Sequence, residues 1–363
     1  HTDATMRQHI PYMLAASPTR MANHIRDFPV FVVGNGPSLD ASIACIKAYQ
    51  NNAIVISCGT ALKALIQHDI IPDYHAEIEQ NRACYDWIAQ STTAQQRQHI
   101  TLISCNGIHP DVVDLFGATR LVAKAGESST LLFLGKREAS QYMFIDHAFP
   151  TVSNFAVNFV LSAGFKNIYL LGIDFGFKDK HHHHSKYSAY YKQQQDTSNF
   201  IKHSHIAHTL PGNFGGHVQT KYEFKIARRY MQECIANYTA EVFNLGDGAK
   251  INGAFALVHD DILLGAEQKH TVVKQVNQDC FATDGLAQFQ ANYAQLLAKS
   301  TDLDVVSVCR LSEQCVSNHA DIQLLCKALT VQLFKAYNEN KTLSFYLLNG
   351  AVHTLCAILL SDI

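Results

Sequence analysis

Short apolar runs alternate with amphipathic stretches over the first half of the chain. Four runs are apolar at nearly every position, as parallel strands covered on both faces are; they span residues 31–33, 53–56, 100–103 and 168–171. Three stretches between them have helical spacing: 40–49, 60–67 and 153–163. This alternation predicts an α/β fold with a mainly parallel sheet flanked by helices. Ligands bind beyond the carboxyl ends of the strands in such sheets, so the residues after each strand are candidates for a site.

The second half of the chain has a different pattern. Residues 177–218 are polar and rich in His, Lys, Tyr and Gln, which predicts a long loop or lid. A helix over 220–238 and a strand over 241–244 follow. Beyond residue 259 we expect helices at 286–299, 321–337 and 342–360, with one short strand at 304–308. The chain is therefore expected to have three regions: an N-terminal helical segment (1–28), a nucleotide-binding α/β domain (29–258) and a C-terminal helical region (259–363).

Composition excludes several classes of protein. The 363 residues carry 29 Lys and Arg against 31 Asp and Glu, a balance that argues against a nucleic-acid partner. The ten cysteines form no Cys-x-x-Cys pair, and several lie in apolar runs, so we expect reduced thiols in a cytoplasmic protein. The longest apolar stretch, Phe345 to Leu360, is interrupted by polar residues and is too short for a membrane span.

A glycine-rich turn follows the first strand. Gly34 and Gly36 permit close approach of a phosphate, and Ser38 opens a helix whose N–H groups attract anions. Leu39 stands where a dinucleotide fingerprint has its third glycine, which disfavours NAD and favours a mononucleotide or phosphate. A simple tight turn explains the two glycines equally well.

Similar polar turns follow other strands of the predicted sheet. Gly59 and Thr60 follow the second strand, Asn106 follows the third, and Ser153 and Asn154 open a helix with good N-cap residues. Each turn by itself is an ordinary cap. Their recurrence at one edge of the sheet favours a shared nucleotide site.

Two segments carry groups that titrate. Residues 73–79 alternate as a strand and place His75, Glu77 and Glu79 on one face, which suits either a ligand or a solvated edge strand. Asp174 ends a buried strand, and a run of four histidines at 181–184 follows it. Consecutive imidazoles diverge, so we expect no metal site there. Imidazole titrates near neutral pH, which favours a histidine base on a lid, with a solvated loop as the alternative.

A second glycine-rich turn, at residues 211–216, precedes the helix at 220–238. Lys221, Lys225, Arg228 and Arg229 lie along one face of that helix. Such a stripe is either a clamp for an anionic ligand or an ordinary solvated face.

From about Pro29 to Ala254 these motifs, in this order, resemble the motility accessory factor family, whose members glycosylate flagellin. The resemblance is carried by several segments: 34–39 (GNGPSL), 59–62 (GTAL), 72–77 (PDYHAE), 152–156 (VSNFA), 171–176 (LGIDFG), 183–188 (HHSKYS) and 212–216 (GNFGG). The family has a Rossmann-like, sialyltransferase-like domain that uses CMP-activated nonulosonic acids. It shares this domain with the 6-hydroxymethylpterin diphosphokinases, which use ATP.

The resemblance implies a role for each matched residue. The CMP moiety would be held by residues of the strand-end turns: Gly34, Asn35, Gly36, Ser38, Gly59, Thr60, Asn106, Ser153 and Asn154. Glu77 and Asp174 would orient the ribose, the sugar or a divalent ion. His183 or His184 would accept the acceptor hydroxyl proton.

The expected function is transfer of a pseudaminic, legionaminic or sialic type of sugar from a CMP-sugar to Ser or Thr of flagellin in a bacterium. No cofactor is required in this interpretation, and Mg²⁺ would act only as an activator. The alternatives are an ATP-dependent pterin diphosphokinase and a non-enzymatic flagellin-binding protein.

Overall fold

The computed structural model describes residues 1–134, 137–179, 182–188, 208–265, 269–287 and 319–339, with the single residues 291, 345, 348, 349 and 352. The chain divides into two compact units. The first comprises His1, Asp3–Ala125 and Ser140–Thr283, and the second comprises Thr2, Gly126–Ala139 and Asp284–Ile363.

An eleven-stranded sheet runs through the described residues of the first unit. Its order is β12 (Phe255–Ala256), β11 (Glu241–Asn244), β8 (Asn167–Leu171), β2 (Val30–Val33), β3 (Ile54–Cys58), β4 (Tyr74–Glu77), β5 (Thr101–Cys105), β6 (Ala118–Lys124), β1 (Tyr12–Met13) and β13 (Phe281–Ala282), with β7 (Phe144–Ile145) paired to β6. The β1–β13 pair is antiparallel, and the other pairs of this sheet are parallel. The predicted fold class, a mainly parallel sheet flanked by helices, is confirmed.

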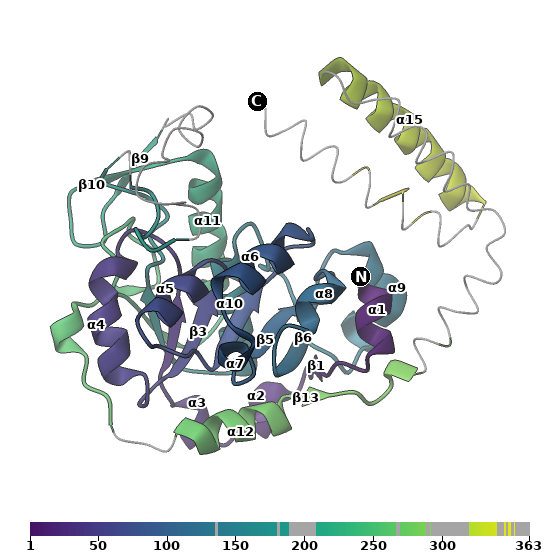
Figure 1. Ribbon diagram of the computed structural model, residues 1–363. Coiled ribbons are helices and arrows are strands. Elements are labelled where there is room, and N and C mark those ends of the chain that lie inside the picture. Colours follow the sequence, from purple (N-terminus) through teal and green to yellow (C-terminus); the bar gives the residue numbers. More distant parts are fainter. Residues whose placement is uncertain are drawn as a thin grey trace. The chain divides into compact units, whose positions relative to one another are not determined.

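Helices cover both faces of the central strands (Figure 1). Val30 and Val32 of β2 belong to the same buried cluster as residues of α10 (Val152–Ala163). Phe31 and Val33 point the other way and pack with α4 (Leu39–Tyr49) and α5 (Ala61–Gln67). Because both faces are buried, the strands are apolar throughout, as the sequence pattern indicated.

The remaining helices are divided between the two units. In the first unit they are α1 (Thr2–Arg7), α2 (Ser17–Arg20), α3 (Asn23–Arg26), α6 (Ala83–Ser91), α7 (Ala94–Arg97), α8 (Pro110–Val113), α11 (Tyr222–Ala236) and α12 (Lys269–Asp279), with a 3₁₀ turn at His259–Asp261. The second unit contains α9 (Ser128–Leu134), the 3₁₀ turn Arg137–Ala139 and α15 (His319–Asn338). The predicted helix over 321–337 is therefore present as α15. Most of the segments 286–299 and 342–360, and all of 304–308, lie outside the described residues.

Two local expectations need correction. The strand over 73–79 is shorter, and it lies between β3 and β5 with every residue buried, so a solvated edge strand is wrong. The stretch 177–218 is not irregular throughout, because β9 (His208–Pro211) and β10 (His217–Thr220) pair as a hairpin. Residues 180, 181 and 189–207 of the expected lid lie outside the described residues.

The limits of the two units differ from the boundaries expected from the sequence. The N-terminal segment contributes β1 to the sheet, and residues of the expected C-terminal region contribute β13 beside it. Val272 and Val276 of α12 also belong to the main buried cluster. Residues 1–28 and 259–283 are thus parts of the first unit, apart from Thr2.

No described helix is long and apolar enough to cross a bilayer. The described cysteines, among them Cys58, Cys84 and Cys234, are free thiols.

Candidate functional site

Two strand-end turns meet at the centre of the sheet. Gly34 N–H donates to Leu171 O, and Gly36 N–H donates to Gly172 O, each at 2.8 Å. A Cβ on Gly36 would lie 2.8 Å from the Asp174 carboxyl carbon and 2.9 Å from Gly172 O, which no side chain tolerates. The glycine at position 36 is therefore required by the neighbouring strand end of the protein itself.

The Asp174 carboxylate binds the start of α4. Ser38 N–H donates to Asp174 Oδ2 at 2.9 Å, and the Ser38 hydroxyl donates to Oδ1 at 2.6 Å. The sequence pattern predicted that N–H groups at the start of this helix bind an anion from outside the protein. The Ser38 N–H instead binds the protein's own Asp174 carboxylate. Burial raises the pKa of Asp174 to about 6, against the opposing effect of the Ser38 hydrogen bonds.

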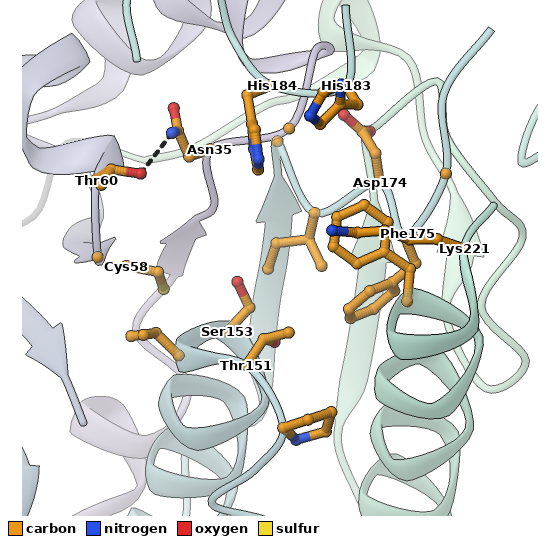
Figure 2. A pocket seen from close by; sticks show the side chains of 18 of the residues that line it. Asn35, Cys58, Thr60, Thr151, Ser153, Asp174, Phe175, His183, His184 and Lys221 are labelled. Carbon is orange, nitrogen blue, oxygen red and sulfur yellow. Dashed lines mark hydrogen bonds between the residues drawn. The ribbon is translucent and has the colours of Figure 1, made fainter. Parts of the chain in front are cut away.

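A pocket of about 280 Å³ opens beside this junction (Figure 2). Asn35 follows β2, and Thr60 lies just past β3; the Asn35 amide donates to the Thr60 hydroxyl at 2.5 Å. Ser153 is in the first turn of α10, whose N-cap Thr151 forms a capping box with Asn154. Residues from three strand ends and one helix start therefore converge on a single cavity.

The histidines lie on a short segment that is fixed to the α4 side of the pocket. Ser185 N–H donates to Asn35 O at 3.0 Å, and the Ser185 hydroxyl donates to Asp40 Oδ1 at 2.6 Å. The Asn35 amide also donates to the Ser188 hydroxyl at 2.7 Å. His183 and His184, which both line the pocket, are held by these contacts. Figure 2 shows the His184 side chain directed into the cavity.

The surroundings lower the pKa of both imidazoles and so favour the neutral form. Burial lowers the pKa of His184 to about 3, and the neighbouring His183 and Lys221 act in the same direction. Burial and the charge of Lys221 also lower the pKa of His183. The expectation of a histidine that titrates near neutral pH is therefore wrong for His184. A neutral imidazole still offers a lone pair that can accept a proton.

Lys221 brings a positive charge to the pocket from the N-terminal end of α11. Its side chain is 17% exposed, its ammonium pairs with Glu223 at 2.9 Å, and it lies 4.5 Å over the Phe224 ring. Of the predicted stripe on this helix, only Lys221 lines the pocket. Arg228 donates to Lys250 O, and Arg229 pairs with Glu233 at 2.8 Å.

Glu77 lies beneath the floor of the pocket rather than in its lining. Its Oε1 accepts hydrogen bonds from Ile78 N–H at 2.8 Å and Glu79 N–H at 3.3 Å. The side chain is 1% exposed, and burial raises its pKa to about 7. A Cβ on Gly59, which lines the pocket, would lie 3.9 Å from Oε2, so the carboxyl group is close to this turn.

Three other predicted residues have structural partners away from the cavity. Gly34 lies against Gly172, where a Cβ would also meet Ile173 at 2.9 Å. Asn106 accepts a hydrogen bond from Lys124 N–H at 3.0 Å and so joins β5 to β6. Asn154 donates from its amide to Ala227 O at 2.8 Å and so joins α10 to α11. Ser38 lines a neighbouring cavity rather than this one.

Sequence reasoning did not assign Cys58, Phe175 and Phe224 to the pocket. Phe175 has a φ of +46°, a strained conformation for a residue with a side chain. Apolar residues that line a cavity follow the same pattern as core residues, so the sequence held no signal for them. No group of three His, Cys, Asp or Glu residues in the described part of the chain is arranged to hold a metal ion.

Comparisons with known proteins agree with this architecture. Residues 5–180 match the family model described as 6-hydroxymethylpterin diphosphokinase MptE-like. This part of the chain is similar to the domain that the model describes. A solved structure, the MAf glycosyltransferase from Magnetospirillum magneticum AMB-1, aligns with a TM-score of 0.63 at 23% identity. The alignment covers 96% of this chain but 58% of that protein, and at this identity it shows a shared fold. No curated protein matches the sequence.

The resemblance drawn from the sequence is confirmed by the family model and the shared fold. The matched region supplies the strand ends, Asn35, Thr60, Ser153 and Asp174. The two histidines and Lys221 come from the chain beyond residue 180, outside the matched region. The matched region therefore forms one part of the pocket, and the segment that follows it forms the rest.

Proposed function

We propose that this protein is a glycosyltransferase that moves a nonulosonic acid from a CMP-sugar to a Ser or Thr hydroxyl of flagellin. The observation that carries the proposal is the convergence of Thr60, Ser153, His184 and Lys221 on one pocket. The fold shared with a glycosyltransferase supports it. In this proposal the protein acts in the cytoplasm of a bacterium, needs no cofactor and uses Mg²⁺ only as an activator.

The reaction exchanges one bond for another at the anomeric carbon. The acceptor hydroxyl oxygen forms a bond to the anomeric carbon. The bond between the anomeric carbon and the phosphate oxygen of CMP breaks, and CMP leaves with the electron pair. The hydroxyl proton passes to a base. His184 is a candidate for this step because its imidazole lines the pocket and is directed into the cavity. His183, its neighbour, is the other candidate.

The donor is anionic, so its phosphate needs a positive partner. Lys221 is the ammonium in the pocket lining among the described residues, and α10 begins at Val152 on the same cavity. The Ser38 N–H donates to Asp174. The proposal therefore places the leaving phosphate near Lys221 and the start of α10 rather than at the Gly34–Ser38 turn.

The family match supports a second candidate, an ATP-dependent pterin diphosphokinase. Thermal-shift measurements with CMP, CDP, ATP with Mg²⁺, and 6-hydroxymethyldihydropterin separate the two functions. The glycosyltransferase is expected to be stabilised by CMP and CDP, and the kinase by ATP with Mg²⁺ and by the pterin. Stabilisation by the latter pair alone would replace our proposal with the kinase.

A variant pair locates the nucleotide. Lys221→Met removes the ammonium of the pocket, and we expect it to weaken CMP binding by about tenfold, as loss of one charge-assisted contact does. Lys225→Met is the matched control, because Lys225 is exposed on the same helix outside the pocket. Equal CMP binding by both variants would place the phosphate elsewhere.

A further inference from the structure

A second cavity of about 470 Å³ adjoins the first one. The two cavities share Asp174 and Gly176. The histidine segment runs between them: His183 lines the first cavity, and the preceding residue, His182, lines the second. The second cavity lies against the start of α4 and the turn after β11. We call it the acidic pocket, after its residues Asp40, Asp174, Asp179 and Asp247.

The charge of the acidic pocket differs from that of the first. Four carboxylates and one ammonium, that of Lys178, line it among the described residues. Lys178 pairs with Asp247 at 2.5 Å, and Asp179 pairs with His182 at 2.7 Å. A CMP-sugar carries a phosphate and a sugar carboxylate, so this cavity repels it. The first pocket is lined by the carboxylates of Glu79 and the shared Asp174 and by the Lys221 ammonium, so it is the less acidic of the two cavities and the one that better suits an anion.

The rim of the acidic pocket presents an apolar side chain on a rigid turn. The Asn213 amide donates to Asn244 O and Gly246 O, each at 2.9 Å, and its N–H donates to Gly248 O at 2.9 Å. These bonds fix the turn between β9 and β10 to the end of β11. The next residue, Phe214, is nevertheless 46% exposed, and Val258 across the rim is 47% exposed. A well-anchored turn that leaves a phenyl ring in water suits an apolar contact with a ligand.

We propose that the acidic pocket is the acceptor site and binds a hydroxyl-bearing peptide segment with apolar and cationic residues beside the hydroxyl. A transferase needs two sites that meet at the reacting bond, and these cavities meet at Asp174 and the histidine segment. Charge assigns the anionic donor to the first pocket and an uncharged or cationic substrate to the acidic pocket. The exposed Phe214 and Val258 supply apolar contacts for side chains flanking the hydroxyl. This inference rests on the proposed function.

Peptide binding in the absence of nucleotide tests the site directly. The probes are two fluorescein-labelled peptides, Lys-Val-Thr-Val-Lys and Glu-Val-Thr-Val-Glu, measured by anisotropy with the full chain. We expect the wild-type protein to prefer the cationic peptide. Phe214→Ala should weaken that binding by about tenfold, as truncation of an aromatic contact commonly does. Phe255→Ala is the matched control, because Phe255 is 63% exposed and lies outside both pockets.

The same variants separate this inference from the proposed function. Thermal shifts with CMP should be unchanged in Phe214→Ala, because its ring lies outside the first pocket. The acceptor site is overturned if the wild type binds neither peptide, prefers the acidic one, or binds the cationic one equally well after Phe214→Ala. A failure of CMP to stabilise the wild type would instead overturn the glycosyltransferase proposal and leave the peptide result standing as a binding site.

Discussion

The carboxylate of Asp40 accepts a hydrogen bond from the hydroxyl of Ser185 at 2.6 Å, across 145 positions of the chain. Its other oxygen accepts from Lys186 N–H at 3.3 Å. Asp40 lies in the first turn of α4, so this helix holds the segment that carries His183 and His184. The position of the histidines therefore depends on a residue that lies outside the first pocket.

We expect Asp40→Asn to loosen this segment, because an amide nitrogen would face a group that donates. Hydrogen exchange of residues 182–188 should become faster by about fivefold to tenfold, the effect of losing roughly 1 kcal/mol of hydrogen bonding. Ser185→Ala should act in the same direction. Asp69→Asn is the control, because Asp69 forms an exposed ion pair with Lys47. Unchanged exchange in both variants would show that other contacts hold the segment.

Gly36→Ala should destabilise the whole first unit and not merely remove a ligand contact. The new methyl group would meet the Asp174 carboxylate and Gly172 O, both of which are fixed by hydrogen bonds. We expect a loss of about 2 kcal/mol or more in the free energy of unfolding, typical of overpacking. Gly265→Ala is the control, because nothing lies within 4 Å of its Cβ. A melting temperature equal to the wild type would contradict this account of Gly36.

Glu77 makes stability depend on pH. Its pKa is raised from 4.5 to about 7 by burial, so the native state binds this proton more tightly than the unfolded chain does. The stabilising contribution is complete below about pH 4.5 and is lost as the pH rises to 7. Asp174, with its pKa raised to about 6, acts in the same direction at slightly lower pH.

Glu77→Gln keeps the acceptor for Ile78 N–H and removes the ionisation. We expect the melting temperature of the wild type to fall between pH 5 and pH 8 by several degrees more than that of the variant. Glu241→Gln is the control, because Glu241 is exposed at the start of β11. Parallel pH curves for the wild type and Glu77→Gln would mean that the carboxyl group is not held protonated.

His184→Asn should lower transfer by about 10²-fold to 10⁴-fold, the range for a positioned base, while CMP affinity stays the same. His183→Asn is its paired comparison. Because the pKa of His184 is about 3, its imidazole stays neutral from pH 5.5 to pH 8. The ratio of wild-type to variant rates should therefore be constant over this range. A ratio that falls several-fold towards pH 5.5 would show that His184 titrates near neutrality after all, and full activity in both variants would assign the base to another residue.

The sequence predicted the central strands and α10 within one or two residues, because both rest on strong local signals. Every side chain of β2 is buried, and Thr151 and Asn154 form the capping box that begins α10. The strand β6 escaped notice because Thr119, Arg120 and Lys124 interrupt it and leave an apolar run of only three residues, 121–123. The strands β1 and β13 are two residues long, which is too short for any periodicity.

The site was predictable as a place but not as a set of contacts. Polar turns after parallel strands must gather at one edge of a sheet, so Asn35, Thr60 and Ser153 could be brought together without a structure. Whether Asp174 would face a ligand or Ser38 depends on the register between β8 and β2, which no local pattern encodes. Burial of His184 likewise arises from residues distant in the chain, so its pKa could not be inferred from an isolated motif.

The sheet order has a consequence for the newly synthesised chain. β2 lies between β3, which follows it closely in sequence, and β8, which emerges from the ribosome far later. Chains are synthesised at about 5–20 residues per second, so the edge of β2 that later pairs with β8 stays unpaired for roughly ten seconds. An apolar strand edge left open for that time invites pairing with other chains. The glycine turns at Gly34–Gly36 and Gly172 thus come together only after β8 has been synthesised, and a chaperone that shelters Val30–Val33 would act during that interval.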